Sequence, residues 1–272
     1  MAFFDEKKLN LRAMGFCGVD DSCSPEQLQL LSTHYAWIEW GILFRPDLEG
    51  TPRYASKAWV DKLCHVNKTA HEHMRLAGHL CQSRCQEVLE GDATFVTELQ
   101  TMGFSRVQIN ATAANGVLVD KAKTAFYVQN MINVMEAVPS LQFIIQYNDE
   151  TKSLWSKLVE SEVPPVKNMS LLFDASCGKG ILATSFPAPM EKIPCGYAGG
   201  MGPGNIASVL DSVRAAADGQ PVWIDMESSL RTIIIGQGGN REDTFSIDKC
   251  FKCILAGINV GLPVAKLSVL SI

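Results

Sequence analysis

The sequence predicts a single (β/α)8 barrel, and three observations lead to this fold class. Eight short apolar runs succeed one another along the chain, each followed by a helical pattern or a loop. Several runs are almost continuously hydrophobic, as strands buried on both faces should be. Two consecutive strand-to-loop junctions near the C-terminus have the form of the phosphate site that follows strands seven and eight of such barrels. A doubly wound open sheet is the competing arrangement.

The predicted strands are the eight apolar runs themselves. They are Arg12–Gly18, Trp37–Phe44, Met74–Leu80, Arg106–Ile109, Leu141–Ile145, Met169–Phe173, Cys195–Ala198 and Val222–Met226.

Helix signals lie between these runs. Ser24-Pro25-Glu26-Gln27 is a capping box with proline at the first helical position, which predicts a helix start. Helical patterns also cover Gln86–Met102 and Lys121–Ala137, and Pro139 marks the end of the second. Two long connections stand out: Arg45–Val66 after the second strand, and Leu230–Asn240, which we expect to be a mobile loop after the eighth.

Size and composition fit one large domain spanning residues 1–272, because α/β barrels reach about 250 residues as a single unit. A net charge of −5 argues against binding to nucleic acid or an anionic membrane. The chain shows no signal peptide and no apolar run of about 18 residues, so we expect no membrane association. Nine scattered cysteines fit reduced thiols, and hence a cytoplasmic protein. We expect a monomer or a homodimer.

The seventh junction, Cys195–Asn205, is rich in glycine and leads into a helical pattern that begins at Ile206. A glycine-rich turn that opens a helix presents free backbone N–H groups, which can hold a phosphate. The eighth junction, Val222–Ser229, follows closely. A tight strand–helix connection explains either junction alone, whereas the pair favours a phosphate site.

If the fold is a barrel, the chemistry must lie where the strands end, since the βα loops gather there. This criterion selects a short set of side chains and glycines. They are Cys17, Arg53, Asn110, Gln146, Asp174, Gly199, Gly200 and Asp225 to Ser229.

Motifs at these positions resemble those of phosphoribosylanthranilate isomerase, the barrel enzyme of tryptophan synthesis, over most of the chain. Ala198–Ile206 is similar to the family's L-A-G-G-L-x-P-x-N-V and is the most specific match. The other matching segments are Phe16–Val19, Ser24–Glu26, Trp40–Phe44, Pro52–Ser56, Val107–Ile109, Leu171–Asp174 with Gly178–Gly180, and Asp225–Leu230.

The resemblance implies an Amadori rearrangement, which converts an N-glycosyl aldose phosphate to a 1-amino-1-deoxyketose phosphate. It implies that Cys17 is the general base for the sugar C2 proton and that Asp174 is the general acid for the ring oxygen. Nearby donors would favour a Cys17 thiolate, and an apolar wall would favour a protonated Asp174. No metal or organic cofactor is needed to move two protons, so none is expected.

Substrate contacts are carried over from the resemblance in the same way. Arg53, Gln108 and Asp225 would bind the substrate, with Arg53 and Asp225 at its aromatic or amine end. Gly199, Gly200 and Ser228 would bind its phosphate.

Four residues depart from the family pattern. Asn110 replaces a histidine, and Gln146 replaces a basic or small residue. Glu227 stands where a serine faces the phosphate, and Ser229 replaces a glycine. A carboxylate at 227 would repel a phosphate dianion unless it turns away or pairs with Lys179 or Arg231.

These departures leave two other functions open. One is a lyase, epimerase or aldolase acting on a different phosphosugar. The other is a phosphate-ligand-binding protein without catalysis.

Two further clusters carry less weight. His65, His71, His73 and His79 with Glu72 specify no third metal ligand by spacing, so we interpret them as a polar surface or strand entry. Cys250 and Cys253 form a C-x-x-C in a helical pattern without a second pair, which argues against a redox or zinc role.

Overall fold

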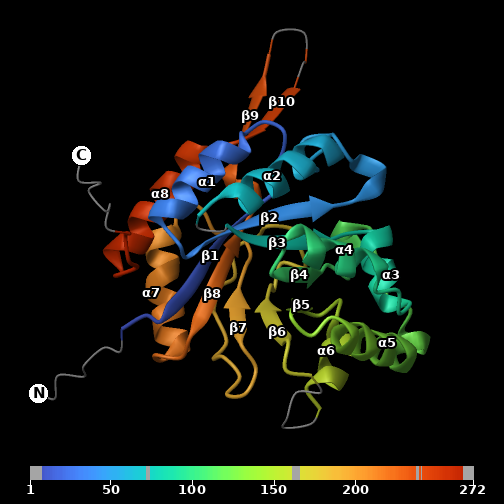
Figure 1. The fold of residues 1–272 in the computed structure, drawn as a ribbon. Helices are drawn as coiled ribbons and strands as arrows, with labels where there is room; N and C mark the ends of the chain where they lie inside the picture. The colour runs from blue at the N-terminus through green and yellow to red at the C-terminus, as the bar shows by residue number, and fades with distance from the viewer. Residues whose placement is uncertain (1–7, 72–73, 161–165, 237–238, 240, 266–272) are drawn as a thin grey trace, which may run out of the picture.

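The computed structural model describes residues 8–71, 74–160, 166–236, 239 and 241–265. Eight parallel strands pair in chain order, and the eighth pairs with the first to close a barrel (Figure 1). The fold class predicted from the sequence, a single (β/α)8 barrel, is therefore confirmed, and the open sheet is excluded.

Each barrel strand lies within two residues of its predicted bounds. The strands are β1 Leu11–Cys17, β2 Ile38–Phe44, β3 Arg75–Leu80, β4 Arg106–Ile109, β5 Gln142–Tyr147, β6 Met169–Phe173, β7 Cys195–Tyr197 and β8 Val222–Met226.

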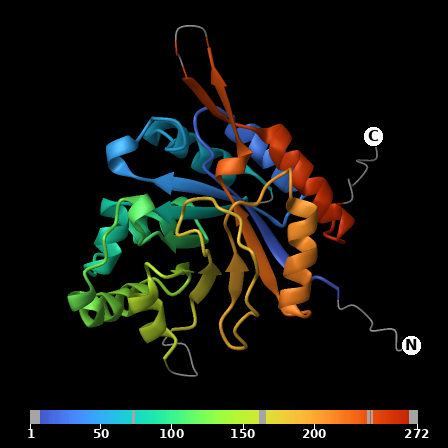
Figure 2. The same ribbon diagram turned by 180° about the vertical axis from the view of Figure 1, so that it is seen from behind.

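Helices flank the barrel on its outside (Figure 2). They are α1 Pro25–His34, α2 Lys57–Thr69, α3 Ser83–Leu89, α4 Thr94–Met102, α5 Thr124–Ala137, α6 Lys152–Leu158, α7 Ile206–Ala217 and α8 Ile247–Asn259.

The capping box before α1 is confirmed, with the Ser24 hydroxyl accepting from the Gln27 amide and the Gln27 side chain accepting from the Ser24 amide. The single helix predicted over Gln86–Met102 is wrong. Gly91, at φ 89°, separates α3 from α4, and this left-handed conformation suits glycine. The helix predicted from Lys121 begins as a single 3-10 turn and becomes α5 at Thr124.

Both long connections contain regular structure that the sequence did not predict. The helix α2 begins at Lys57, inside the segment Arg45–Val66. The expected loop Leu230–Asn240 is instead part of an antiparallel hairpin of β9 Arg231–Ile235 and β10 Arg241–Phe245, which projects from the barrel (Figures 1 and 2). Residues 237, 238 and 240 lie outside the described part of the chain.

The connection from β6 to β7 departs from the regular alternation. Residues 174–194 are all described, and none of them is helical. This long loop brings Asp174 and Gly178 to the cavity described below.

Glycines on the inner barrel face make room for large or charged side chains from neighbouring strands. A Cβ on Gly15 would lie 2.3 Å from the Asp225 carboxylate, and one on Gly196 would lie 2.2 Å from the Trp223 ring. Trp223 packs under the cavity floor in a small cluster with Ala13, Ile144, Leu172 and Ala198. The outward-facing side chains of the strands form the main core against the helices.

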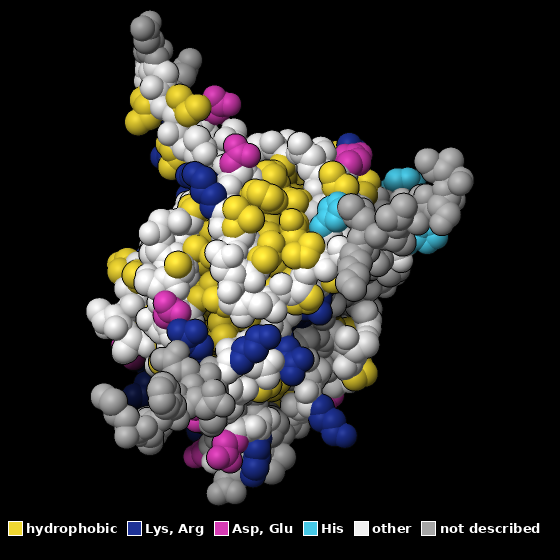
Figure 3. Space-filling model, turned by 90° about the vertical axis from the view of Figure 1, so that its left-hand side faces the viewer, with side chains coloured by type: hydrophobic (Ala, Val, Ile, Leu, Met, Phe, Trp, Pro, Cys, Tyr) yellow, Lys and Arg dark blue, Asp and Glu magenta, His cyan; other side chains and the backbone are white. Residues whose placement is uncertain are grey.

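Hydrophobic side chains gather on the face that carries α1 and α8 (Figure 3). Leu30 of α1 and Phe251 and Leu255 of α8 are among the large exposed apolar residues. No helix within the described ranges is long and apolar enough to span a membrane.

Candidate active site at the carboxyl ends of the strands

A cavity of about 310 Å³ lies at the carboxyl ends of the barrel strands. Side chains and glycines of β3 to β8 and the loops that follow them form its wall. They include His79, Gln108, Asn110, Asn115, Gln146, Asp174, Gly178, Gly180, Gly199, Gly200, Asp225, Glu227, Ser228 and Ser229. Most of the predicted strand-end residues therefore meet around one cavity.

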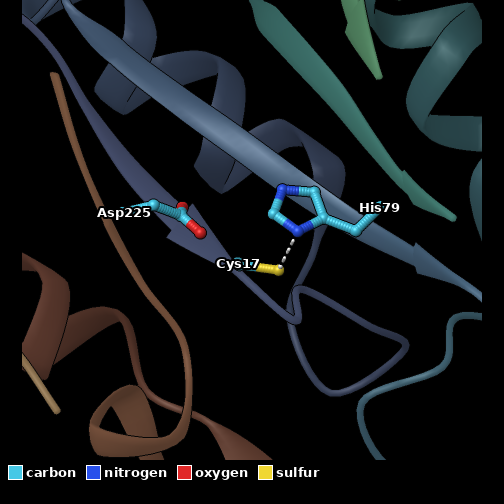
Figure 4. A group of neighbouring side chains, drawn as sticks. All are labelled: Cys17, His79 and Asp225. Carbon is cyan, nitrogen blue, oxygen red and sulfur yellow. Dashed lines mark hydrogen bonds between the residues drawn. The ribbon is translucent and has the colours of Figure 1, made fainter. Parts of the chain in front are cut away.

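Cys17 lies at the end of β1, as predicted, but behind the cavity wall and only 1% exposed. Its Sγ is 3.2 Å from Nδ1 of His79 on β3 (Figure 4). Gly41 on the intervening strand β2 permits this contact, because a Cβ there would lie 2.9 Å from both Cys17 and His79.

The interpretation of His79 as part of a polar surface is wrong, since it is buried on the inner face of the barrel. The related residues His65 and His71 are exposed, and Glu72 and His73 lie outside the described residues.

The electrostatic surroundings of Cys17 differ from those expected for a thiolate. Burial, followed by the nearby carboxylates of Asp225 and Glu227, raises its pKa well above the ordinary value. Burial and the charge of Arg106 lower the pKa of His79 to about 3. At neutral pH the pair is therefore a neutral thiol beside a neutral imidazole.

Asp225 projects from β8 toward this pair (Figure 4). One ligand atom each of Cys17, His79 and Asp225 lies within 4.8 Å of the others. Burial raises the pKa of Asp225 well above its usual range, and the carboxylates of Glu39 and Glu227 raise it further.

Asp174 follows β6, and a turn of the next loop holds its carboxylate. Oδ1 accepts hydrogen bonds from the Ser176 amide at 3.1 Å and the Ser176 hydroxyl at 2.6 Å. Oδ2 accepts from the Gly178 amide at 2.9 Å. The carboxylate thus lies among donors rather than against the apolar wall that the sequence suggested.

Amide side chains form the side of the cavity between His79 and Asp174. Gln108 of β4 donates to the Asn110 side chain at 2.7 Å, and Asn110 donates to the sulfur of Cys81. Gln146 of β5 is buried, and its Oε1 atom has no hydrogen-bond partner within the described structure. An unpaired buried acceptor that lines a cavity is suited to a hydroxyl or amine of a ligand.

The two glycines of the seventh junction have backbones that favour glycine, with φ of 104° at Gly199 and 60° at Gly200. Gly200 lies directly against the loop after β6, since a Cβ there would be 2.2 Å from the Leu182 nitrogen. Ser228 lies next to Gly180, since a Cβ there would be 3.5 Å from the Ser228 hydroxyl. Ser229 donates a hydrogen bond to the Met201 carbonyl, which ties the two junctions together.

Arg53 lies beside the eighth junction. Its Nη1 donates to Glu227 at 3.1 Å and to the Ser228 hydroxyl at 3.3 Å. Glu227 is therefore paired with Arg53 and not with Lys179 or Arg231, the two partners considered from the sequence. Burial raises the pKa of Glu227, and the charges of Arg53 and Arg231 oppose this rise.

A buried ion-pair network behind Arg53 was missed by the sequence analysis. Arg231 at the base of the hairpin is 3% exposed and pairs with Asp20 of the first loop at 2.7 Å. It also pairs with Asp243 of β10 and donates to the Gly18 carbonyl at 2.8 Å. The network fastens the hairpin to the loop after Cys17. The run of charged residues at 241–243, directly before Thr244 and Phe245, is the one signal that could have indicated it.

The cysteines of the C-x-x-C, Cys250 and Cys253, are both buried in α8 as free thiols.

Comparisons with known proteins show the fold. No protein-family model matches the chain, and no curated protein sequence is significantly similar to it. The chain is similar in structure to TrpF from Jonesia denitrificans, with a TM-score of 0.51 and 14% sequence identity over 92% of this chain and 98% of that one. A GH18 chitinase from Pseudoalteromonas aurantia has a TM-score of 0.44 at 8% identity, covering 80% of this chain and 94% of that one.

Proposed function

We propose that the protein is an isomerase of a phosphorylated sugar amine, carrying out the Amadori rearrangement of the phosphoribosylanthranilate isomerase family. The observation that carries this proposal is the arrangement around one cavity. Asp174 and the glycine-rich phosphate-type junction line it, and Cys17 lies one contact behind its wall. The motif resemblance along the chain and the fold shared with TrpF are consistent with it.

In the proposed reaction, Asp174 gives a proton to the ring oxygen of the sugar, and the bond between C1 and that oxygen breaks. The resulting C1 iminium acidifies the proton on C2. Once the His79 ring moves aside and exposes the buried sulfur to the cavity, Cys17 removes the C2 proton as general base, and the enol that forms tautomerises to the ketose. Two proton transfers suffice, so the chemistry draws only on side chains of this chain.

His79 assists Cys17 in this scheme. A buried thiol with a raised pKa is a poor base by itself. Transfer of its proton to Nδ1 of His79, 3.2 Å away, gives a thiolate and an imidazolium whose charges cancel. Because burial and Arg106 lower the pKa of His79 to about 3, this transfer requires an ionised Asp225 carboxylate to stabilise the imidazolium. His79 then acts as a positioning and proton-holding residue for Cys17.

The phosphate is proposed to bind at the cavity end formed by Gly199, Gly200 and Ser228. Backbone N–H groups at glycines and the hydroxyl of Ser228 are donors suited to phosphate oxygens. The guanidinium of Arg53, 3.3 Å from that hydroxyl, adds positive charge when a phosphate draws it away from Glu227. This position favours a phosphate contact for Arg53 over one at the aromatic end.

The test is the turnover of phosphoribosylanthranilate, followed by the loss of substrate fluorescence. The wild type should turn over, and Cys17→Ala and Asp174→Asn should each lower kcat by about 10²-fold or more. Cys177→Ala serves as the matched control, because Cys177 lies in the same loop as Asp174 but is outside the cavity. Wild-type rates in both site variants would overturn the assignment.

One observation favours a second candidate, a phosphosugar-binding protein without this reaction. Cys17 lies behind His79, and the Arg53–Glu227 pair occupies the phosphate end. This candidate predicts that phosphosugars raise the melting temperature while the substrate stays unchanged.

A further inference from the structure

Three side chains of different chemistry converge at the base of the cavity. Cys17 comes from β1, His79 from β3 and Asp225 from β8, and their ligand atoms lie within 4.8 Å of one another (Figure 4). A thiol sulfur, an imidazole nitrogen and a carboxylate oxygen are the three donor types that proteins offer to Zn²⁺. In the proposed isomerisation the Asp225 carboxylate only stabilises the His79 imidazolium, a role that does not require it to lie close to the Cys17 sulfur as well.

The spacing suits a tetrahedral ion. With a Zn–S bond of about 2.3 Å and a Zn–N bond of about 2.0 Å, the sulfur and nitrogen of a tetrahedral site lie about 3.5 Å apart. The observed separation of Cys17 Sγ and His79 Nδ1 is 3.2 Å, so a shift of a few tenths of an ångström makes room for the ion. The Asp225 carboxylate, within 4.8 Å of both atoms, is the third ligand.

The cavity lining adds negative charge, which Arg53 on Glu227 and Arg106 near His79 offset in part. Among the described residues that line the cavity, Asp174, Asp225 and Glu227 are acidic and none is lysine or arginine. His79 and Asp225 face the cavity directly, which leaves a fourth coordination position open to water or a ligand hydroxyl.

We propose that Cys17, His79 and Asp225 form a Zn²⁺-binding site with one open coordination position. The sulfur binds as a thiolate, and its proton leaves to solvent when the ion enters. Two backbone features shape the site: Gly41 lets Cys17 and His79 meet, and Gly15 gives space to Asp225. Where the proposed function holds, bound zinc occupies the sulfur of Cys17, the general base of the isomerisation. Zinc binding and turnover of the sugar therefore exclude each other.

The experiment uses the full-length protein, reduced and stripped of metal with a chelator, and titrates it with Co²⁺ in the absence of any sugar. We expect one Co²⁺ per chain, with a thiolate-to-cobalt charge-transfer band and the intense visible bands of tetrahedral cobalt. Stoichiometric Zn²⁺ should abolish both. Because no substrate is present, this result is independent of the proposed isomerase activity.

Variants identify the ligands. Cys17→Ser should lose the charge-transfer band, and His79→Gln and Asp225→Asn should each weaken binding by about tenfold or more. Cys81→Ser is the matched control, because Cys81 is a buried neighbour of Cys17 but is not one of the three proposed ligands. Its sulfur accepts a hydrogen bond from Asn110. A band that persists in Cys17→Ser, or that disappears in Cys81→Ser, would overturn the assignment.

A measurement on the wild type covers the case in which a variant does not fold. X-ray absorption of the zinc-loaded protein should show one sulfur at about 2.3 Å, with the remaining ligands nitrogen or oxygen. Absence of stoichiometric metal binding, or two or more sulfur ligands, would refute the site.

Discussion

Replacing Gly196 by alanine should destabilise the barrel from its centre. The new Cβ would lie 2.2 to 2.5 Å from three atoms of the Trp223 ring, whereas non-bonded carbon atoms prefer about 3.5 to 4.0 Å. The ring must therefore move by more than about 1 Å. Its retreat is hindered because the Arg106 guanidinium lies 4.2 Å above it, held in turn by Glu39 at 2.9 Å.

Overpacking of a filled core costs about 1–3 kcal/mol, and the hindered ring places this site toward the upper end. A loss of about 2–3 kcal/mol lowers the Tm of a 272-residue chain by about 4–5 °C. Calorimetry or thermal unfolding followed by circular dichroism measures the shift. Gly204→Ala is the matched control, since a Cβ there meets nothing within 4 Å and should change the stability by less than about 0.5 kcal/mol. Equal Tm values for Gly196→Ala and the wild type would refute the packing of Trp223 described here.

Three other variants probe the site and its supports. Glu227→Gln should lower the KM for a phosphosugar by about tenfold, because it frees Arg53 and removes a negative charge from the phosphate end of the cavity. An unchanged or higher KM in steady-state kinetics would contradict this. Asp243→Asn should cost about 3 kcal/mol at pH 7 by leaving Arg231 short of a buried partner. Burial raises the pKa of Asp243, but the hydrogen bond and charge of Arg231 outweigh this effect, so the net pKa is lowered. The stability of the wild type should therefore fall as the pH drops below about 4. Denaturation curves of the wild type and Asp243→Asn should converge there. Ser24→Ala should cost about 1 kcal/mol in urea denaturation through loss of the α1 cap, and no change would show that the cap contributes nothing.

The fold was predictable because strands buried on both faces leave a strong signal. Runs such as Met169–Phe173 and Val222–Met226 were located to the residue, since their outward side chains face helices and are apolar. The helix expected across Gly91 was wrong, because helical periodicity continues through a glycine that in fact adopts a left-handed turn. The absence of a helix between β6 and β7 is different, because residues 174–194 show no helical periodicity in the sequence and no helix was predicted there.

The candidate site was predictable only in part, for a related physical reason. Strand-end position identified Asp174 and Asp225 without any knowledge of packing. The role of His79 was missed because it depends on Gly41 of another strand. Since Gly41 has no side chain, the His79 ring can contact Cys17. Register between strands decides such contacts, and a single sequence does not reveal register. The same limitation hid the pairing of Glu227 with Arg53, 174 residues apart.

The most direct test of the central claim follows the sugar carbon at which the proposed rearrangement takes place. Phosphoribosylanthranilate labelled with ¹³C at C2 is incubated with the wild-type protein, and the label is observed by nuclear magnetic resonance. The account predicts that the C2 signal moves from the carbinol to the ketone region, and that Cys17→Ala leaves it in place. A carbinol signal that persists with folded wild-type protein, or a ketone signal that forms equally with Cys17→Ala, would contradict the account.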